Sequence, residues 1–482
     1  MIPPQNYLSY ILILILVSSG GYFLFKPSSK SDSSILAQST PTPTPKPTPE
    51  IIVQSQPVKA LPGKLDTVPM FNSNSPEWVK TEGILLSTFS PTGKTVPEAH
   101  LNFPFQGRFD IFVHHQTHTP KDSQTFYLGV ILYNPGKKSV TVDILQGASY
   151  QTKDAPYIKL PPYLDNPDNT SYSGPGDRAV LDILQGKRQS DFPEKLVIPP
   201  GQSRMLMNLP MPVVNLEKPI NGRSGLIRLK SSGEVYAASM MMFAKKNTDG
   251  KERAPTLEEW QNLLNTGKLA TPRDKIPTPP EQIGGQLIYG RVAGVQSGSK
   301  WLGKLTDNPN GKDFTIPESG QGISYPIASL KGGRLGTEQN QTAQMLVRYP
   351  DTAYQAHGNY CVEYNLSLPL YNPTEQSQTV ALTIETPLKE DKLSRGGLLF
   401  QNPSRDFPFF RGSVRLKYTD DSGKLITKYI HLWHKTGQIL EPLQKIVMPP
   451  GSRNLVQIDL IYPPDSTPPQ VLTVKTILTA DN

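Results

Sequence analysis

The chain has 482 residues, enough for two or more domains, and its 49 prolines are roughly double the usual share of ~5%. Proline is unsuited to helix interiors and central strands, so this composition excludes a mainly helical protein and favours short strands with rigid connections. The net charge of +8 is spread along the chain, which excludes the clustered basic pattern of nucleic-acid-binding proteins. A single cysteine, Cys361, excludes an intrachain disulfide, and we expect it to be a buried structural thiol.

The N-terminal part predicts export from the cytoplasm. Tyr7–Phe25 contains 19 uncharged, mostly apolar residues, which as a helix would just cross a bilayer core of ~30 Å. We therefore interpret residues 1–37 as a signal peptide, cleaved near Ala37, or as an anchor retained in the inner membrane. The expected location is the periplasm or cell envelope.

A Thr/Pro-rich spacer follows at residues 38–50. Its alternating prolines deny it helix and sheet hydrogen bonds, so we expect an extended polyproline-like segment. A spacer directly behind a hydrophobic segment favours the membrane anchor over the cleaved signal.

The next part, residues 51–255, contains strand and turn signals in a definite order. Apolar residues alternate over 126–133 and run into Asn134-Pro135. A second alternating segment follows at 140–144, and Pro199-Pro200-Gly201 comes later. Two further strands are expected at 226–229 and 235–243, with a hairpin turn at 230–233, whereas 151–178 is expected to be loop.

The same order recurs in residues 281–482. An alternating segment at 362–370 precedes Tyr371-Asn372-Pro373, a second one spans 380–384, and Pro449-Pro450-Gly451 follows. The Asn-Pro pairs are 238 residues apart (372 − 134) and the Pro-Pro-Gly triplets 250 apart (449 − 199), which predicts one β unit used twice.

The repeated order predicts the fold class. The order is a strand, an Asn-Pro turn, a second strand, Pro-Pro-Gly and a further strand. This order is similar to that of many bacterial immunoglobulin-like domains, in which Pro-Pro-Gly would form the corner where the chain changes sheets. We therefore expect a mainly β protein with two tandem immunoglobulin-like antiparallel β-sandwich domains, at 51–255 and 281–482.

A linker with a short helix is expected between them, at 256–280. Thr256 is a suitable N-cap, and Glu259 three residues later would complete a capping box. Leu257, Trp260 and Leu264 would share one helix face, and Gly267 would end the helix.

Aromatic residues in loop-like surroundings are candidates for carbohydrate binding, because a flat apolar ring beside polar groups suits a sugar. The candidates are Trp301, Tyr349, Asp351 and Tyr354. Packing in the core is the alternative, and it is the commoner role of such rings.

An oxygen-rich loop is the candidate metal site. Asp165, Asp168 and Asp177 could ligate a calcium ion, although the spacing is not that of an EF-hand and Asx-Pro turns explain the composition without a metal. No catalytic set is recognised: the chain contains no HExxH or P-loop motif, and Gly201-Gln202-Ser203-Arg204 lacks the last glycine of a nucleophile elbow. No cofactor is expected.

Several long segments resemble the cyanobacterial DUF3370 family, a likeness that covers nearly all of 51–482. The segments that carry it are Leu61–Asp66, Asn72–Trp78, Glu82–Ser87, Arg348–Tyr354, Tyr371–Thr374 and Tyr462–Asp465. The function of this family is unknown, so the resemblance implies an exported cyanobacterial protein and assigns no site residue.

The favoured hypothesis is thus a non-enzymatic envelope protein that binds an envelope polysaccharide or an envelope protein, with no nucleic-acid partner and with membrane contact through Tyr7–Phe25 if that segment is retained. The alternative is a hydrolase acting on envelope carbohydrate, with carboxylates drawn from loops such as 165–177 or from Asp351.

Overall fold

The structure is a computed structural model that describes residues 48–118, 124–282 and 284–478. The predicted signal or anchor at 1–37, including Tyr7–Phe25, and the spacer up to residue 47 lie outside the described residues. Among the helices of the described part, none is long and apolar enough to cross a membrane. From Thr48 onward the chain forms one compact unit.

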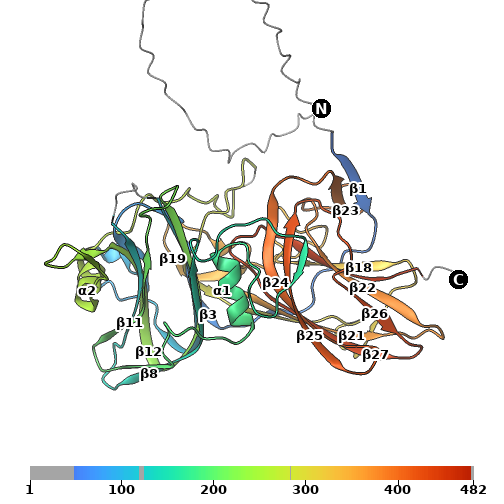
Figure 1. Cartoon of the computed structure of the whole chain (residues 1–482), viewed down its shortest axis with the longest axis horizontal. Coiled ribbons are helices and arrows are strands. Elements are labelled where there is room, and N and C mark those ends of the chain that lie inside the picture. Colours follow the sequence, from blue (N-terminus) through green and yellow to red (C-terminus); the bar gives the residue numbers. More distant parts are fainter. Residues whose placement is uncertain (1–47, 119–123, 283, 479–482) are drawn as a thin grey trace, which may run out of the picture. The chain divides into compact units, whose positions relative to one another are not determined.

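The described residues are mainly β, as predicted, and the strands form open sheets with two α-helices beside them (Figure 1). The helices are α1 (Pro175–Leu184) and α2 (Leu257–Thr266), and a 3₁₀ turn spans Pro97–Ala99.

The largest sheet has twelve strands, eight of them in the order β10-β8-β12-β6-β3-β15-β19-β20. Its strands are β3 (Pro69–Ser73), β4 (Trp78–Val79), β5 (Gly83–Ser87), β6 (Phe105–His118), β7 (Phe126–Tyr133), β8 (Val140–Gln151), β10 (Lys195–Ile198), β11 (Ser203–Met211), β12 (Ile220–Phe243), β15 (Ala293–Ser297), β19 (Ala343–Arg348) and β20 (Gln355–Ala356).

The other sheets have eight, four, two and two strands. The eight-stranded sheet contains β2 (Lys64–Leu65), β9 (Tyr163–Asp165), β16 (Lys300–Lys304), β17 (Phe314–Thr315), β21 (Glu363–Tyr371), β24 (Pro408–Thr419), β25 (Leu425–Lys435) and β27 (Arg453–Ile461). The four-stranded sheet has the order β18-β28-β22-β26, with β18 (Gly322–Ile327), β22 (Gln378–Glu385), β26 (Gln444–Met448) and β28 (Gln470–Thr476). The pairs are β1 (Glu50–Gln54) with β23 (Leu398–Asn402), and β13 (Lys245–Lys246) with β14 (Glu252–Arg253).

The repeated sequence order corresponds to a repeated strand arrangement. In the first copy β10 pairs with β8, β8 with β12 and β12 with β6; in the second copy β26, β22, β28 and β18 follow the same order. The strand before each Asn-Pro turn pairs with the strand after each Pro-Pro-Gly: β7 with β11, and β21 with β27. The register also matches, because Tyr133 faces Ser203 and Tyr371 faces Arg453.

In each copy the Asn-Pro turn contacts the Pro-Pro-Gly turn. Asn134 is fully buried and its Nδ2 donates to the carbonyl oxygens of Lys138 (2.7 Å) and Ile198 (2.8 Å). Asn372 is also fully buried, and its Nδ2 donates to the equivalent oxygens of Gln376 and Met448, both at 2.8 Å. Each asparagine therefore holds its Asn-Pro turn against the residue that precedes the Pro-Pro-Gly triplet of the same copy.

Two local predictions were wrong. Residues 230–233 are not a hairpin turn, because β12 continues through them. Its register shifts between Ser231 and Val235: β12 pairs with β8 before the shift, with β6 on both sides of it, and with β5 and β7 after it. The end of the expected loop at 151–178 is helical, since α1 begins at Pro175, a residue suited to the first turn of a helix.

The predicted helix is confirmed as α2. The Thr256 side chain accepts from the Glu259 amide, the Glu259 carboxylate accepts from the Thr256 amide, and Gly267 is the C-cap. Trp260 and Leu264 on its inner face are buried against β5, β11 and β12. A hairpin joins β24 to β25, and Thr419 of β24 faces Leu425 of β25.

The sheets cross the boundaries expected at 255 and 281. β15 and β19 belong to the twelve-stranded sheet, whereas β2 and β9 belong to the eight-stranded one (Figure 1). A buried ionic network also joins the two parts: Arg228 of β12 forms an ion pair with Glu363 of β21 (2.5 Å), and Lys300 pairs with the same carboxylate (3.1 Å). The tandem immunoglobulin-like division stays a prediction.

Candidate functional site

Two of the predicted sugar-binding rings are in the core. Trp301 is 5% exposed, its ring stacks on Tyr364, and its Nε1 donates to the Pro62 carbonyl oxygen (3.0 Å). Tyr349 is 1% exposed, and its hydroxyl donates to the Ala99 carbonyl oxygen (2.7 Å) and accepts from the Ser87 amide (3.0 Å). Neither ring face is accessible to a sugar, because each fills its own hydrophobic cluster.

The other two members of that set are partly exposed. The Asp351 carboxylate accepts two hydrogen bonds from Arg273, at 2.7 and 3.0 Å, and the Arg273 guanidinium holds the pKa of Asp351 below its usual value. The guanidinium of Arg348 lies over the Tyr354 ring, 3.8 Å from its centre. The structure therefore does not bring Trp301, Tyr349, Asp351 and Tyr354 into one site.

The predicted metal ligands are not gathered either. Asp177 is 1% exposed at the start of α1, and its Oδ2 accepts from His431 (2.7 Å) and from the Ser173 amide (2.9 Å). Asp165, on β9, and Asp168 are exposed. In the part of the chain that the structure describes, no three His, Cys, Asp or Glu side chains are grouped as a metal site would require.

The loop carboxylates considered for hydrolysis thus have structural partners. Asp177 joins α1 to β25 through His431, and Asp351 is engaged by Arg273. Cys361 is 1% exposed and burial raises the pKa of its thiol well above the usual value, so the prediction of an inert structural thiol is confirmed.

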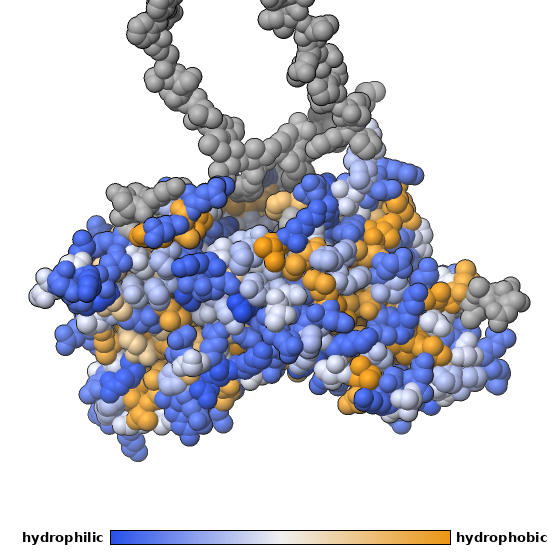
Figure 2. Space-filling model, in the orientation of Figure 1, coloured by the Kyte–Doolittle hydropathy of each residue, from blue (hydrophilic) through white to orange (hydrophobic). Residues whose placement is uncertain are grey.

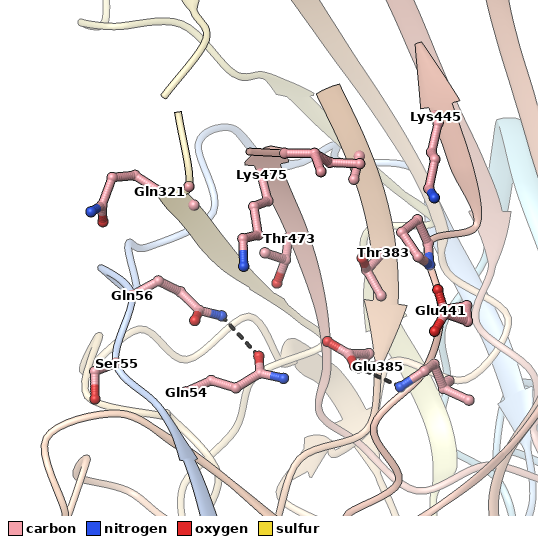
Figure 3. A pocket seen from close by; sticks show the side chains of 16 residues that line it. Gln54, Ser55, Gln56, Gln321, Thr383, Glu385, Glu441, Lys445, Thr473 and Lys475 are labelled. Atoms are coloured by element: carbon pink, nitrogen blue, oxygen red, sulfur yellow. Dashed lines mark hydrogen bonds between the residues drawn. The ribbon is translucent and has the colours of Figure 1, made fainter. Parts of the chain in front are cut away.

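A groove of about 560 Å³ lies on the outer face of the four-stranded sheet (Figure 3). Its floor consists of Ala381, Thr383 and Glu385 of β22 with Thr473 and Lys475 of β28. The walls come from distant segments: Gln54, Ser55 and Gln56 at the end of β1, Gly320, Gln321 and Gly322 at β18, and Leu440, Glu441, Pro442 and Lys445 at β26; Ile477 completes the lining.

The lining combines apolar surface, from Ala381, Leu440, Pro442 and Ile477, with hydrogen-bonding groups and both charges. Three glutamine amides, two threonine hydroxyls, two lysines and two glutamates face the groove, and no aromatic residue is among the described residues that line it. The threonines are fixed by the sheet, and Thr473 Oγ1 hydrogen-bonds to Ser324 Oγ (2.7 Å), which in turn accepts from Gln56 Nε2 (3.0 Å). Such a surface would bind a ligand through hydrogen bonds and charge, not through ring stacking.

Glu385 is the titratable group with the most perturbed environment in the groove. It is 4% exposed, and its Oε1 accepts from the Leu440 amide (3.0 Å). Burial raises the pKa of the Glu385 carboxyl to about 7, although the hydrogen bond from the Leu440 amide acts to lower this pKa. The carboxyl therefore changes charge near neutral pH, as general acids and ligand-sensing groups do.

In the first copy a helix occupies part of the equivalent face. The apolar side chains of α1 pack on β8 and β12 against Phe112, Ala148 and Leu226, and the rest of this face, including Lys195 and Lys230, is exposed. In the second copy the corresponding face carries polar residues in place of an apolar surface. A sheet face that a helix partly covers in one copy, and that stays open and carries polar residues in the other, is a candidate binding site.

A smaller hollow of about 340 Å³ is lined by residues 418–422 and 444–446. In Figure 2 hydrophobic residues of the described part are interspersed among hydrophilic ones. The large apolar side chains with the greatest exposure, among them Ile276 and Phe407, come from separate segments. Single exposed apolar residues of this kind are ordinary on a soluble surface and need no partner.

The sequence did not reveal the groove residues, because they come from five short stretches between 54 and 477 and form no motif. One signal was available: polar residues alternate along β22 and β28 as Thr383, Glu385, Thr473 and Lys475, which marks the outward face of strands whose other residues are buried.

Comparisons with known proteins identify the family to which the chain belongs. A search of curated proteins gave no match. Matching solved structures include the coconut allergen cocosin, with 9% identity over 78% of this chain and 84% of that one and a TM-score of 0.09. A variant of B. subtilis oxalate decarboxylase matches with 10% identity over 82% of this chain and 81% of that one, and a TM-score of 0.10. TM-scores this low carry no inference.

The family comparison covers most of the chain. The family described as "Protein of unknown function (DUF3370)" matches residues 56–476, a range that includes both copies of the strand arrangement and all of the groove except its outermost residues Gln54, Ser55 and Ile477. The chain belongs to the DUF3370 family.

Proposed function

We propose that this protein is a non-enzymatic binding module of the cell envelope, exported from the cytoplasm, and that the groove holds a hydroxyl-rich envelope polysaccharide. The observation that carries the proposal is a groove lined by hydrogen-bonding and charged side chains on a sheet face whose counterpart in the first copy is partly covered by α1. The amides of Gln54, Gln56 and Gln321 can hydrogen-bond to sugar hydroxyls. Gln54 is the last residue of β1, and Gln56 Nε2 donates to Gln54 Oε1 (3.1 Å) and to Ser324 Oγ (3.0 Å), which holds these two side chains in place.

Filling the groove should abolish this binding. Thr383 lies on the floor, so Thr383→Arg would place a long side chain where the ligand lies, and we expect retention of the full chain on immobilised envelope polysaccharide to fall at least ~10-fold, the loss of roughly one good polar contact. Thr379→Arg is the matched control, because Thr379 is on the same strand and the same face but does not line the groove.

Retention and circular dichroism of both variants check this prediction. If wild-type protein is retained on no polysaccharide fraction, or if Thr383→Arg and Thr379→Arg bind equally well, the groove is not the binding site.

Binding should also depend on pH through Glu385. A ligand that covers the groove removes water from this carboxyl, which favours the neutral form, so binding should be tighter below pH 7 and weaker as the pH rises through about 7. The other charged groups of the groove are Glu441, Lys445 and Lys475. We expect Glu385→Gln, a neutral mimic, to bind at pH 8.5 as well as wild type binds at pH 5.5; a Glu385→Gln profile with the wild-type slope would contradict the role of this carboxyl.

One observation favours a second function, hydrolysis of the bound polymer. Glu385 and Glu441 line the same groove, and glycoside hydrolases use two carboxyl groups about 5–10 Å apart across the scissile bond. If the wild-type protein releases reducing ends from the retained polymer and Glu385→Gln does not, the protein is an enzyme and not a binding module.

A further inference from the structure

The two copies of the strand arrangement differ in one row of side chains that runs across three strands. In the first copy Lys195 of β10 faces Asp143 of β8, and Asp143 faces Lys230 of β12. Lys195 Nζ lies 4.0 Å from Asp143 Oδ1. A carboxylate between two lysines compensates their charge at this position.

The second copy keeps the lysines and loses the carboxylate. Lys445 of β26 faces Ala381 of β22, and Ala381 faces Lys475 of β28, in the same register as Lys195, Asp143 and Lys230. Both lysines are exposed, and no ion pair among the described residues includes either of them. All three residues line the groove.

The spacing of the lysines suits an anion. Neighbouring strands lie about 4.8 Å apart, so two lysines on the outer members of three adjacent strands start about 10 Å apart, and their flexible side chains can converge on one group between them. In Figure 3 Lys475 and Lys445 project from the strands on either side of β22. The small Ala381 side chain leaves the space above the middle strand to the ligand.

We propose that Lys445, Ala381 and Lys475 form an anion-binding subsite, and that the ligand of the groove is an acidic polysaccharide whose carboxylate or sulfate group takes the place that the Asp143 carboxylate has in the first copy. This inference rests on the proposed function and names the class of polymer. The surrounding glutamine amides and threonine hydroxyls bind the sugar hydroxyls, and the two lysines select the charged unit.

The decisive variant is Ala381→Asp, which supplies the missing carboxylate from the protein itself. The first copy already holds an aspartate between two lysines, so the substitution is compatible with the strand arrangement. We expect retention of the full chain on polygalacturonic acid to fall about 10-fold or more, because the lysines are then engaged and the new charge repels the ligand. Asp143→Ala, the reverse change in the first copy, is the matched control and should leave retention unchanged.

The lysines are tested separately, with Lys475→Gln and Lys445→Gln in the groove and Lys195→Gln as the control in the first copy. Each groove variant should weaken binding several-fold and reduce its dependence on salt, whereas Lys195→Gln should do neither. These variants, checked by circular dichroism, decide the question even if Ala381→Asp fails to fold.

The choice of polymer separates the two proposals. Retention is measured on polygalacturonic acid, dextran sulfate and neutral dextran. Preference for either acidic polymer, lost in Ala381→Asp and in Lys475→Gln, supports the subsite and identifies carboxylate or sulfate as the group bound. Equal retention on neutral dextran, with no effect of these substitutions, overturns the subsite and leaves the binding module; retention on none of these polymers nor on any envelope polysaccharide fraction overturns both.

Discussion

Replacing Arg228 by methionine should lower the free energy of unfolding by about 3–5 kcal/mol, the usual cost of removing one partner from a buried ion pair. Arg228 is 6% exposed, and its guanidinium lies 2.5 Å from Glu363 and 3.7 Å from Asp110. Both carboxylates are buried, so the variant would leave Glu363 with Lys300 alone and Asp110 with Arg108 alone. Urea unfolding of the full chain measures the change.

The pH dependence gives this prediction a second readout. Burial would raise the pKa of Glu363, but Arg228 and Lys300 hold it at about 2, so its ionised form stabilises the fold above about pH 4.5, and that stabilisation is lost as the pH falls toward 2. Burial raises the pKa of Asp110 despite Arg228 and Arg108, so protonation of this carboxyl favours the fold as the pH falls. In Arg228→Met both carboxyls should take up protons at higher pH. The difference from wild type should therefore shrink on acidification.

A surface pair provides the control. Arg453 pairs with Asp313 at 2.9 Å, but its side chain is 60% exposed, so Arg453→Met should change stability far less than Arg228→Met. Equal effects of the two substitutions, or a difference that does not depend on pH, would show that the buried network does not join the two parts of the fold.

Asn372→Ala should cost about 2–4 kcal/mol, because it leaves buried carbonyl oxygens of two turns without a donor, at ~1–3 kcal/mol each. Asn372 Nδ2 donates to Gln376 and Met448, and its Oδ1 accepts from the Thr374 amide (3.0 Å). Alanine can replace none of these hydrogen bonds. Thermal or urea unfolding gives the measurement.

The first copy offers a matched experiment. Asn134 makes the same contacts with the residue four positions on and with the residue before the Pro-Pro-Gly triplet, so Asn134→Ala should destabilise by a similar amount. Thr374→Ala, which removes a partly exposed hydroxyl from the second turn, should have a smaller effect. If one asparagine is costly to replace and the other is not, the two corners are not equivalent in energy despite their common geometry.

Much of the fold could be predicted from local chemistry. The Asn-Pro and Pro-Pro-Gly turns identified the repeated arrangement because an asparagine amide and two prolines restrict the backbone wherever they occur. The capping residues Thr256 and Glu259 likewise determine where α2 begins. These signals act within a few residues, so they can be read without knowledge of the tertiary structure.

Other features depend on contacts between distant segments. Lys230–Gly233 has the composition of a turn, yet β12 runs straight through it, since neighbouring strands pair with β12 on both sides of the shift. Loop-like surroundings made Trp301 a candidate for sugar binding, but Pro62 and Tyr364 enclose it, so the alternative of core packing is the correct one. The groove combines residues from 54 to 477, and the exchange of Asp143 for Ala381 becomes visible only once the register aligns the two copies.

The exchange of strands between the two parts has a consequence for the history of the chain. β2 and β9 complete the sheet of the second copy, and β15 and β19 extend the sheet of the first. A present-day half cut out of this protein would therefore leave unpaired backbone at several sheet edges and tend to aggregate. If a single ancestral unit was doubled, the borrowing of strands came after the doubling, and from that point the two units could diverge in sequence but could no longer be separated.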